Sequence, residues 1–149
     1  MNTLTADLEA IAALLTRLIG AQQRLLANDL AGCGLTFPQF ITISALEQFD
    51  GECRMGPLAA AAMQSAASMT GIVDRLLERG VVERERHPED RRAVVVRLTG
   101  KGRGLLAKVK ENRLQQGRLL LASMPPEDRQ RIREMLVDMV EFMEKDAGD

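Results

Sequence analysis

The side chains best suited to binding chemistry are arginines gathered in one short polar segment. They are Arg84, Arg86, Arg91, Arg92 and Arg97. A guanidinium binds phosphate through paired hydrogen bonds, and a neighbouring carboxylate, here Asp90, can orient it. An arginine on a thin hairpin can reach a narrow DNA minor groove, where the negative potential is deepest. The alternative is a solvated hairpin whose arginines pair with Glu83, Glu85 and Glu89.

The other reactive residues form no pattern typical of catalysis or metal binding. His87, the only histidine, lies in the same arginine-rich turn, so neither a Ser–His–Asp nor a Cys–His arrangement is supported. We expect it to be an exposed turn residue rather than a metal ligand or pH sensor, because one histidine supplies a single titrating or ligating group. No zinc-protease, phosphate-loop or dinucleotide motif occurs. We therefore expect no enzyme, no catalytic residues, no metal and no cofactor.

Cys33 and Cys53 are the two thiols of the chain. They are too few and too loosely spaced for a disulfide framework or a zinc site, so ordinary thiols are expected. A redox switch is the alternative, because a cysteine of lowered pKa can react with oxidants without a recognisable motif.

Composition indicates a globular chain with an uneven charge distribution. Of its 149 residues, 46% are hydrophobic and 28% are charged, enough to bury a core. The net charge is −1, but residues 54–103 carry +4 and the remainder −5, which fits a nucleic-acid-binding centre flanked by helices with another role. No apolar run reaches the roughly 18 to 20 residues of a membrane span, and Met1–Leu15 lacks the basic start of a secretory signal. A cytoplasmic protein with no membrane partner is expected.

Hydrophobic spacing predicts a mainly helical, α+β chain. The expected helices span residues 4–30, 37–49, 58–63, 66–79 and 101–123, and a last one starts at Pro126. Thr36 and Gln39 can form a capping box at the second helix. Ser65 and Thr99 can cap the fourth and the fifth.

One small β-hairpin interrupts the helices. Residues 81–86 and 93–98 alternate and are rich in β-branched side chains, which predicts a two-stranded antiparallel ribbon. Two short helices joined by a tight turn and followed by a ribbon are the order of a winged helix-turn-helix. We expect this lobe over 36–103 and a helical dimerisation region over 1–32 and 104–146, intertwined as a single domain.

The helix over 66–79 has two faces at 100° per residue. One is apolar and is expected to pack on the preceding helices; it holds Met69, Ile72, Val73 and Leu76. The other is small and neutral near its N-terminal end, at Ala67, Ser68 and Gly71. Small side chains there would let the helix end approach a major groove while its free N–H groups meet phosphate. An ordinary amphipathic helix is the alternative.

The terminal helices carry more apolar surface than a small winged lobe can cover. Burial at about 25 cal/mol per Å² would favour association of two copies. The alternative is that both helices cap a monomeric core.

Two stretches resemble the MarR family. Asp90-Arg91-Arg92, followed by Leu98-Thr99, is similar to the family's wing signature of Asp-x-Arg, five residues and Leu-Thr. The stretch from Ser65 to Val82 is similar to its recognition helix and first wing strand. In element order and length the resemblance covers nearly the whole chain.

This resemblance implies a homodimer that places two winged lobes over a pseudo-palindromic site in double-stranded DNA. It implies that Arg92 enters the minor groove with Asp90 orienting it, and that the recognition helix lies at the major groove. The expected DNA contacts are Ser65, Ala67, Ser68, Thr70, Gly71, Arg75, Arg86, Asp90, Arg91 and Arg92. Two positions depart from the family pattern: Gly71 replaces a longer, often basic side chain, and His87 replaces a common acidic residue.

We therefore expect a dimeric, sequence-specific DNA-binding transcriptional regulator, acting as a repressor that a small-molecule effector releases. In the family such effectors are often aromatic or phenolic and bind between the dimer helices and the winged lobe; the sequence does not indicate which residues would line that pocket. The alternatives are a winged-helix module that binds another protein, and a thiol sensor that uses Cys33 or Cys53.

Overall fold

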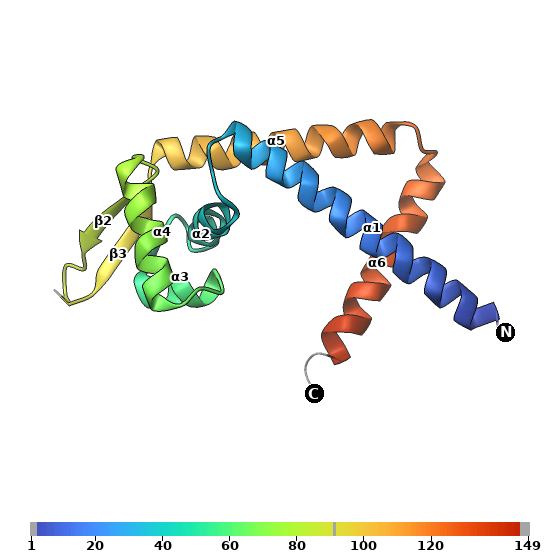
Figure 1. Ribbon diagram of the computed structural model, residues 1–149, viewed down its shortest axis with the longest axis horizontal. Helices are drawn as coiled ribbons and strands as arrows, with labels where there is room; N and C mark the ends of the chain where they lie inside the picture. The colour runs from blue at the N-terminus through green and yellow to red at the C-terminus, as the bar shows by residue number, and fades with distance from the viewer. Residues whose placement is uncertain (1–2, 91, 147–149) are drawn as a thin grey trace. The chain divides into compact units, whose positions relative to one another are not determined.

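The computed structural model describes residues 3–90 and 92–146. The chain divides into two compact units, Met1–Glu111 and Asn112–Asp149. Its elements in chain order, labelled in Figure 1, are α1 (Thr3–Gly32), α2 (Phe37–Gln48), β1 (Glu52–Arg54), α3 (Met55–Ala61), α4 (Ala66–Glu78), β2 (Val82–Arg86), β3 (Val94–Leu98), α5 (Gly100–Ala122) and α6 (Pro126–Asp146). The expected mainly helical class with a small antiparallel sheet is confirmed.

Local capping signals set where the helices begin. The Thr36 side chain accepts a hydrogen bond from the Gln39 N–H, and the Gln39 side chain accepts one from the Thr36 N–H, so the predicted capping box closes the start of α2. Ser65 caps α4 by accepting from the Ser68 N–H. The third helix spans Met55–Ala61, so the predicted span 58–63 was wrong at both ends; Pro57 is tolerated inside it because it lies in the first turn, where a missing N–H costs little.

The sheet has three strands where the sequence predicted two. Its order is β1-β3-β2, and both pairs are antiparallel. Cys53 of β1 lies opposite Val96 of β3, and Val82 of β2 lies opposite Leu98. The two-stranded ribbon was therefore an incomplete prediction. A three-residue strand is too short to show a period, and its hydrogen-bonding partner is distant in the sequence.

One hydrophobic core joins α4 to the sheet and to the start of α5. Met69, Val73 and Leu76 of α4 are fully buried, as the apolar face predicted, while Ile72 is half-buried at its edge. Val96 of β3 is fully buried in the same core. Burying one face of α4 leaves the opposite face at the surface of this unit (Figure 1).

The described helices of the second unit expose their apolar residues. None of the buried core residues falls within 112–145, the part of this unit whose burial is described. Ile132, Met135, Leu136 and Met139 of α6 are all exposed. Across the described residues, no helix combines the length and the apolar character needed to cross a membrane.

The first turn of α5 passes close to the end of α4 at Gly102. A Cβ atom added there would lie 2.4 Å from the Val81 carbonyl oxygen and 2.6 Å from Leu98 Cδ1. The Gly102 N–H donates to the Thr99 hydroxyl at 3.1 Å, and that hydroxyl donates to the Val81 carbonyl at 2.9 Å. Glycine is therefore required where α5 crosses the base of the wing.

Replacing Gly102 with alanine should destabilise the fold by about 1–3 kcal/mol, because an added methyl group forces backbone shifts in a packed site. Urea unfolding followed by circular dichroism measures the change in free energy. Gly104→Ala is the matched control, since no atom lies within 4 Å of its added Cβ. In a helix that change should stabilise by about 0.5–1 kcal/mol. Equal effects of the two substitutions would contradict the close approach.

Candidate nucleic-acid interface

The outward face of α4 is small, polar and exposed. The residues on this face belong to the helix itself, except for the cap residue Ser65. They are Ser65, Ala67, Ser68, Thr70, Gly71 and Arg75. At the start of the helix the Ser65 hydroxyl lies 3.0 Å from the Ser68 hydroxyl and accepts from the Ser68 N–H at 3.1 Å. The Thr70 hydroxyl donates to the Ala66 carbonyl at 3.0 Å. The face therefore offers hydroxyl groups and helix N–H groups without a bulky side chain in front of them.

A hollow of about 370 Å³ lies beside this face. Its walls are formed by α4 residues, including Ala67, Gly71 and Arg75, and by Thr36 and Gln39 at the start of α2. Nothing lies within 4 Å of a Cβ added to Gly71, so packing inside the chain does not require glycine there. The absence of a side chain at Gly71 opens the helix backbone to an approaching molecule.

Ion pairs divide the wing arginines into two groups. Arg84 of β2 donates to the Asp74 carboxylate of α4 at 2.6 Å, which ties the wing to the outward edge of α4. Arg97 of β3 pairs with Glu52 at 2.9 Å and with Glu85 at 3.1 Å. The hydrogen bond to Glu52, followed by the charge of Glu85, raises the pKa of Arg97. These two arginines are neutralised within the chain.

Arg86 and Arg92 are exposed near the tip of the wing. Arg86 lies two residues after Arg84 on β2, so both point to the side of the sheet that faces α4. Neither Arg86 nor Arg92 forms an ion pair with any residue in the described ranges 3–90 and 92–146. Their positive charges remain available, that of Arg86 on the side of β2 that carries Arg84 and that of Arg92 in the turn at the tip.

The turn at the wing tip is held by Asp90 and His87. The Asp90 carboxylate accepts from the backbone N–H of Arg92 at 3.0 Å, and pairing of this carboxylate with the Arg92 guanidinium stays a prediction. The His87 Nδ1 atom accepts from the Glu89 N–H at 3.3 Å, so the ring takes part in the turn. Arg91, another predicted contact, lies outside the described residues.

Sequence reasoning missed the partners that neutralise Arg84 and Arg97. It considered Glu83, Glu85 and Glu89 as partners, and of these Glu85 pairs with Arg97. The other partners, Asp74 and Glu52, come from α4 and from the unpredicted strand β1. Because side chains alternate along a strand, the sequence already places Arg84 and Glu85 on opposite faces of β2. The register of β1 against β3, which places Glu52 opposite Arg97, is decided only by folding.

Both cysteines are buried, at 8% exposure for Cys33 and 9% for Cys53. Burial raises the pKa of the Cys53 thiol, and a backbone hydrogen bond at Arg54 opposes this only in part. Because the thiolate is the reactive form, a raised pKa makes Cys53 a slower nucleophile toward oxidants. Within the described part of the chain, no three His, Cys, Asp or Glu side chains come together as a metal site would require.

These features define a class of protein. A helix is buried on one side and exposes a small polar face on the other, and an arginine-bearing hairpin stands beside it. This arrangement is that of a winged helix-turn-helix protein.

Comparison with known proteins agrees with this class. A model of the MarR family matches residues 34–93. The HTH-type transcriptional repressor NicR of Pseudomonas putida is 33% identical over 114 residues, which cover 76% of this chain and 71% of NicR. The chain belongs to the MarR family. The curated proteins to which it is similar carry the names of transcriptional regulators.

Solved structures show the same fold. A MarR family protein from Bacillus stearothermophilus superimposes with a TM-score of 0.82 at 24% identity, covering 96% of this chain and 98% of that one. A single-residue mutant of MepR from S. aureus, bound to an oligodeoxyribonucleotide, superimposes with a TM-score of 0.70 at 18% identity, covering 89% of this chain and 97% of that one.

Proposed function

We propose that the protein is a homodimeric, sequence-specific repressor that binds a pseudo-palindromic site in duplex DNA and leaves it when a small-molecule effector binds. The observation that carries the proposal is the exposed small-residue face of α4, together with two arginines of the adjoining wing that have no ion pair in the described chain. Membership of the MarR family and the repressor name of NicR support it. The protein would act in the cytoplasm, with the DNA that it regulates.

In this proposal α4 reads the major groove. The Ser68 hydroxyl would donate to a phosphate or base edge near the N-terminal end of the helix, Ser65 and Thr70 would contact DNA by exchanging their present hydrogen bonds, and Arg75 would contact the backbone further along. Ala67 and Gly71 would let the helix approach closely. Hydroxyl groups and helix N–H groups serve phosphate binding without requiring a long side chain.

The wing would read the neighbouring minor groove. Arg92 would enter the groove, Arg86 and Arg91 would contact phosphates, and Asp90 would orient the tip. The segment 54–103 carries +4 within a chain of net charge −1, so the positive charge lies where DNA contact is proposed. Binding through several phosphates would weaken steeply as salt rises.

Arg92→Ala should weaken duplex binding by about 1–3 kcal/mol, the usual cost of losing one arginine contact to DNA. The measurement is a fluorescence anisotropy titration at two salt concentrations, with duplexes selected by the wild-type protein from a random library.

Arg97→Gln is the matched control, because it removes the same charge from an arginine already paired with Glu52 and Glu85. Its affinity should stay close to that of the wild type. Equal losses of duplex affinity in Arg92→Ala and Arg97→Gln would show that the wing tip has no special part in DNA binding. If the wild-type protein binds no duplex at low salt, the wing is better explained as a surface that binds another protein.

Dimerisation is supported by apolar residues that no part of the described chain covers. On α1 these include Leu4 (71% exposed), Leu8 (65%) and Ile11 (51%), and they share one helix face. The α6 helix of the second unit carries exposed apolar residues as well. Apolar area buried at about 25 cal/mol per Å² would stabilise the contact of two copies.

Ile11→Lys should shift the protein from dimer to monomer and abolish tight binding of a two-half-site duplex, because a buried unpaired charge opposes association. Sedimentation velocity measures the oligomeric state. Glu9→Lys is the control, since Glu9 is exposed on the opposite side of the helix. A monomeric wild type that still binds the duplex tightly would overturn the dimer proposal.

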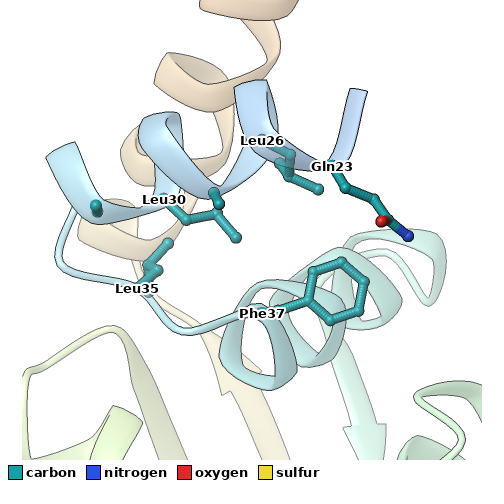
Figure 2. A pocket seen from close by; sticks show the side chains of 7 residues that line it. Gln23, Leu26, Leu30, Leu35 and Phe37 are labelled. Atoms are coloured by element: carbon teal, nitrogen blue, oxygen red, sulfur yellow. The ribbon is translucent and has the colours of Figure 1, made fainter. Parts of the chain in front are cut away.

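An apolar pocket supports release by an effector. It has a volume of about 400 Å³ and lies between the last turns of α1 and the start of α2. Figure 2 shows Leu26 and Leu30 of α1 above Phe37 of α2, with the Gln23 amide at one side of the ring. Such a site suits a small molecule with one flat apolar part and one polar group.

Enlarging Ala27, which lines this pocket, should reduce the effector response by filling the space. The experiment screens small aromatic acids and phenols for release of the bound duplex, and then repeats the active compounds with Ala27→Leu. Affinity for DNA should stay unchanged, whereas the concentration needed for release should rise about tenfold or more, as expected when a ligand must compete with a filled cavity.

Ala13→Leu, at an exposed position outside the pocket, is the control and should respond like the wild type. Release at the same concentration from the Ala27 variant would place the effector elsewhere.

A further inference from the structure

The end of α4 is bonded directly to the end of α1. Arg79, the C-cap residue of α4, donates through Nη2 to the Cys33 carbonyl at 3.0 Å and through Nη1 to the Gly34 carbonyl. These two carbonyls follow the last turn of α1 and lead into α2. One guanidinium therefore joins two segments that are 45 residues apart in the sequence.

Gly34 closes the C-terminal cap of α1 through the bonds from Leu35 N–H to the Leu30 carbonyl and from Gly34 N–H to the Ala31 carbonyl, and it lies against Arg79. Gly34 has a positive φ of 63°, and a Cβ added to it would lie 3.2 Å from Arg79 Nη2. A side chain at residue 34 would therefore press on the guanidinium. Arg79 forms no ion pair with any described acidic residue, so its charge is directed at carbonyl oxygens, which are partly negative at a helix C-terminus.

The same turn is also bonded to α5. Lys101 donates through Nζ to the Arg79 carbonyl at 2.7 Å, and the Thr99 hydroxyl shares its one proton between the Gly80 carbonyl at 2.7 Å and the Val81 carbonyl at 2.9 Å. The C-terminal turn of α4 is thus held from two sides. On the α1 side, the bonds from Arg79 are the polar link.

Small movements at this link would be amplified along α1. Within the described helix, Leu30 is the buried residue and Leu26 packs partly against the core, so α1 is anchored near its C-terminal end. A 30-residue helix is about 45 Å long, so a tilt of about 10° at this end moves the other end by about 8 Å. The apolar face proposed for dimerisation lies along that outer part.

We infer that Arg79 is a positioning residue that fixes the angle between the reading helix α4 and the dimer helix α1, and so sets the spacing between the two half-sites of the DNA. The inference rests on the proposed function. Arg79 lies at the C-terminal end of α4, away from the N-terminal end that would enter the groove, so its effect on DNA binding passes through α1.

The test compares Arg79→Met with the wild type on a series of duplexes. Each carries two half-sites chosen by selection with the wild-type protein, and the spacer is lengthened or shortened by single base pairs. A duplex with one half-site is added. The wild type should bind one spacing much more tightly than the others and more tightly than the single half-site.

Arg79→Met should lose at least about tenfold in affinity at the preferred spacing, as expected for the loss of hydrogen bonds from a charged group. Its affinity for the single half-site should be unchanged, and its preference among spacings should be flattened. Arg79→Lys, which keeps the charge and can form one of the bonds, should recover part of the preference. If urea titrations show that Arg79→Met is unfolded, the test rests on Arg79→Lys. That variant is then expected to show a weaker preference among spacings than the wild type.

Arg75→Met is the matched control on the same helix, because Arg75 is exposed on the proposed reading face. It should weaken the single half-site and all spacings alike. A wild-type spacing profile in both Arg79 variants would overturn the inference. A wild type that shows no preference for two half-sites would instead overturn dimeric binding itself.

Discussion

The burial of one face of α4 is the constraint on which the site depends. Met69, Val73 and Leu76 have no exposed surface, so the helix cannot rotate without moving apolar groups into water. Complete burial of each such side chain contributes about 1.5–3 kcal/mol. Because an α-helix has fixed side-chain angles, the same burial directs Ser68 and Gly71 outward. The exposed face that is proposed to read DNA is thus a consequence of the core.

Electrostatic pairing adds a second level of organisation. The wing has several arginines, but Arg84 is used to hold the hairpin against α4, and Arg97 is used to bridge β1 and β2 across β3. Each exposed pair contributes little to stability, about 0–1 kcal/mol. Their importance lies in the distribution of charge, because Arg84 and Arg97 are neutralised within the chain while Arg86 and Arg92 near the tip have no ion pair among the described residues.

In the described residues, α1 and α6 each expose many apolar side chains but contribute little to the buried core. Their exposed leucines, isoleucines and methionines suit contact with a second copy. Polar bonds at Arg79, Thr99 and Lys101 join the C-terminal end of α4 to the segment after α1 and to the start of α5, and so connect the helix proposed to read DNA with α1, which is proposed to contact a second copy.

The sequence by itself determined the order of the helices, the caps at Thr36 and Ser65 and the buried face of α4, because these depend on residues within one or two turns of each other, and its motifs also carried the family resemblance. The tertiary structure decided the third strand, the requirement for Gly102, the partners of Arg84 and Arg97, and the bond from Arg79 to the end of α1. Cys33 and Gly34, for example, meet Arg79 only after folding. Periodicity describes single elements, whereas contacts across tens of residues depend on how those elements pack.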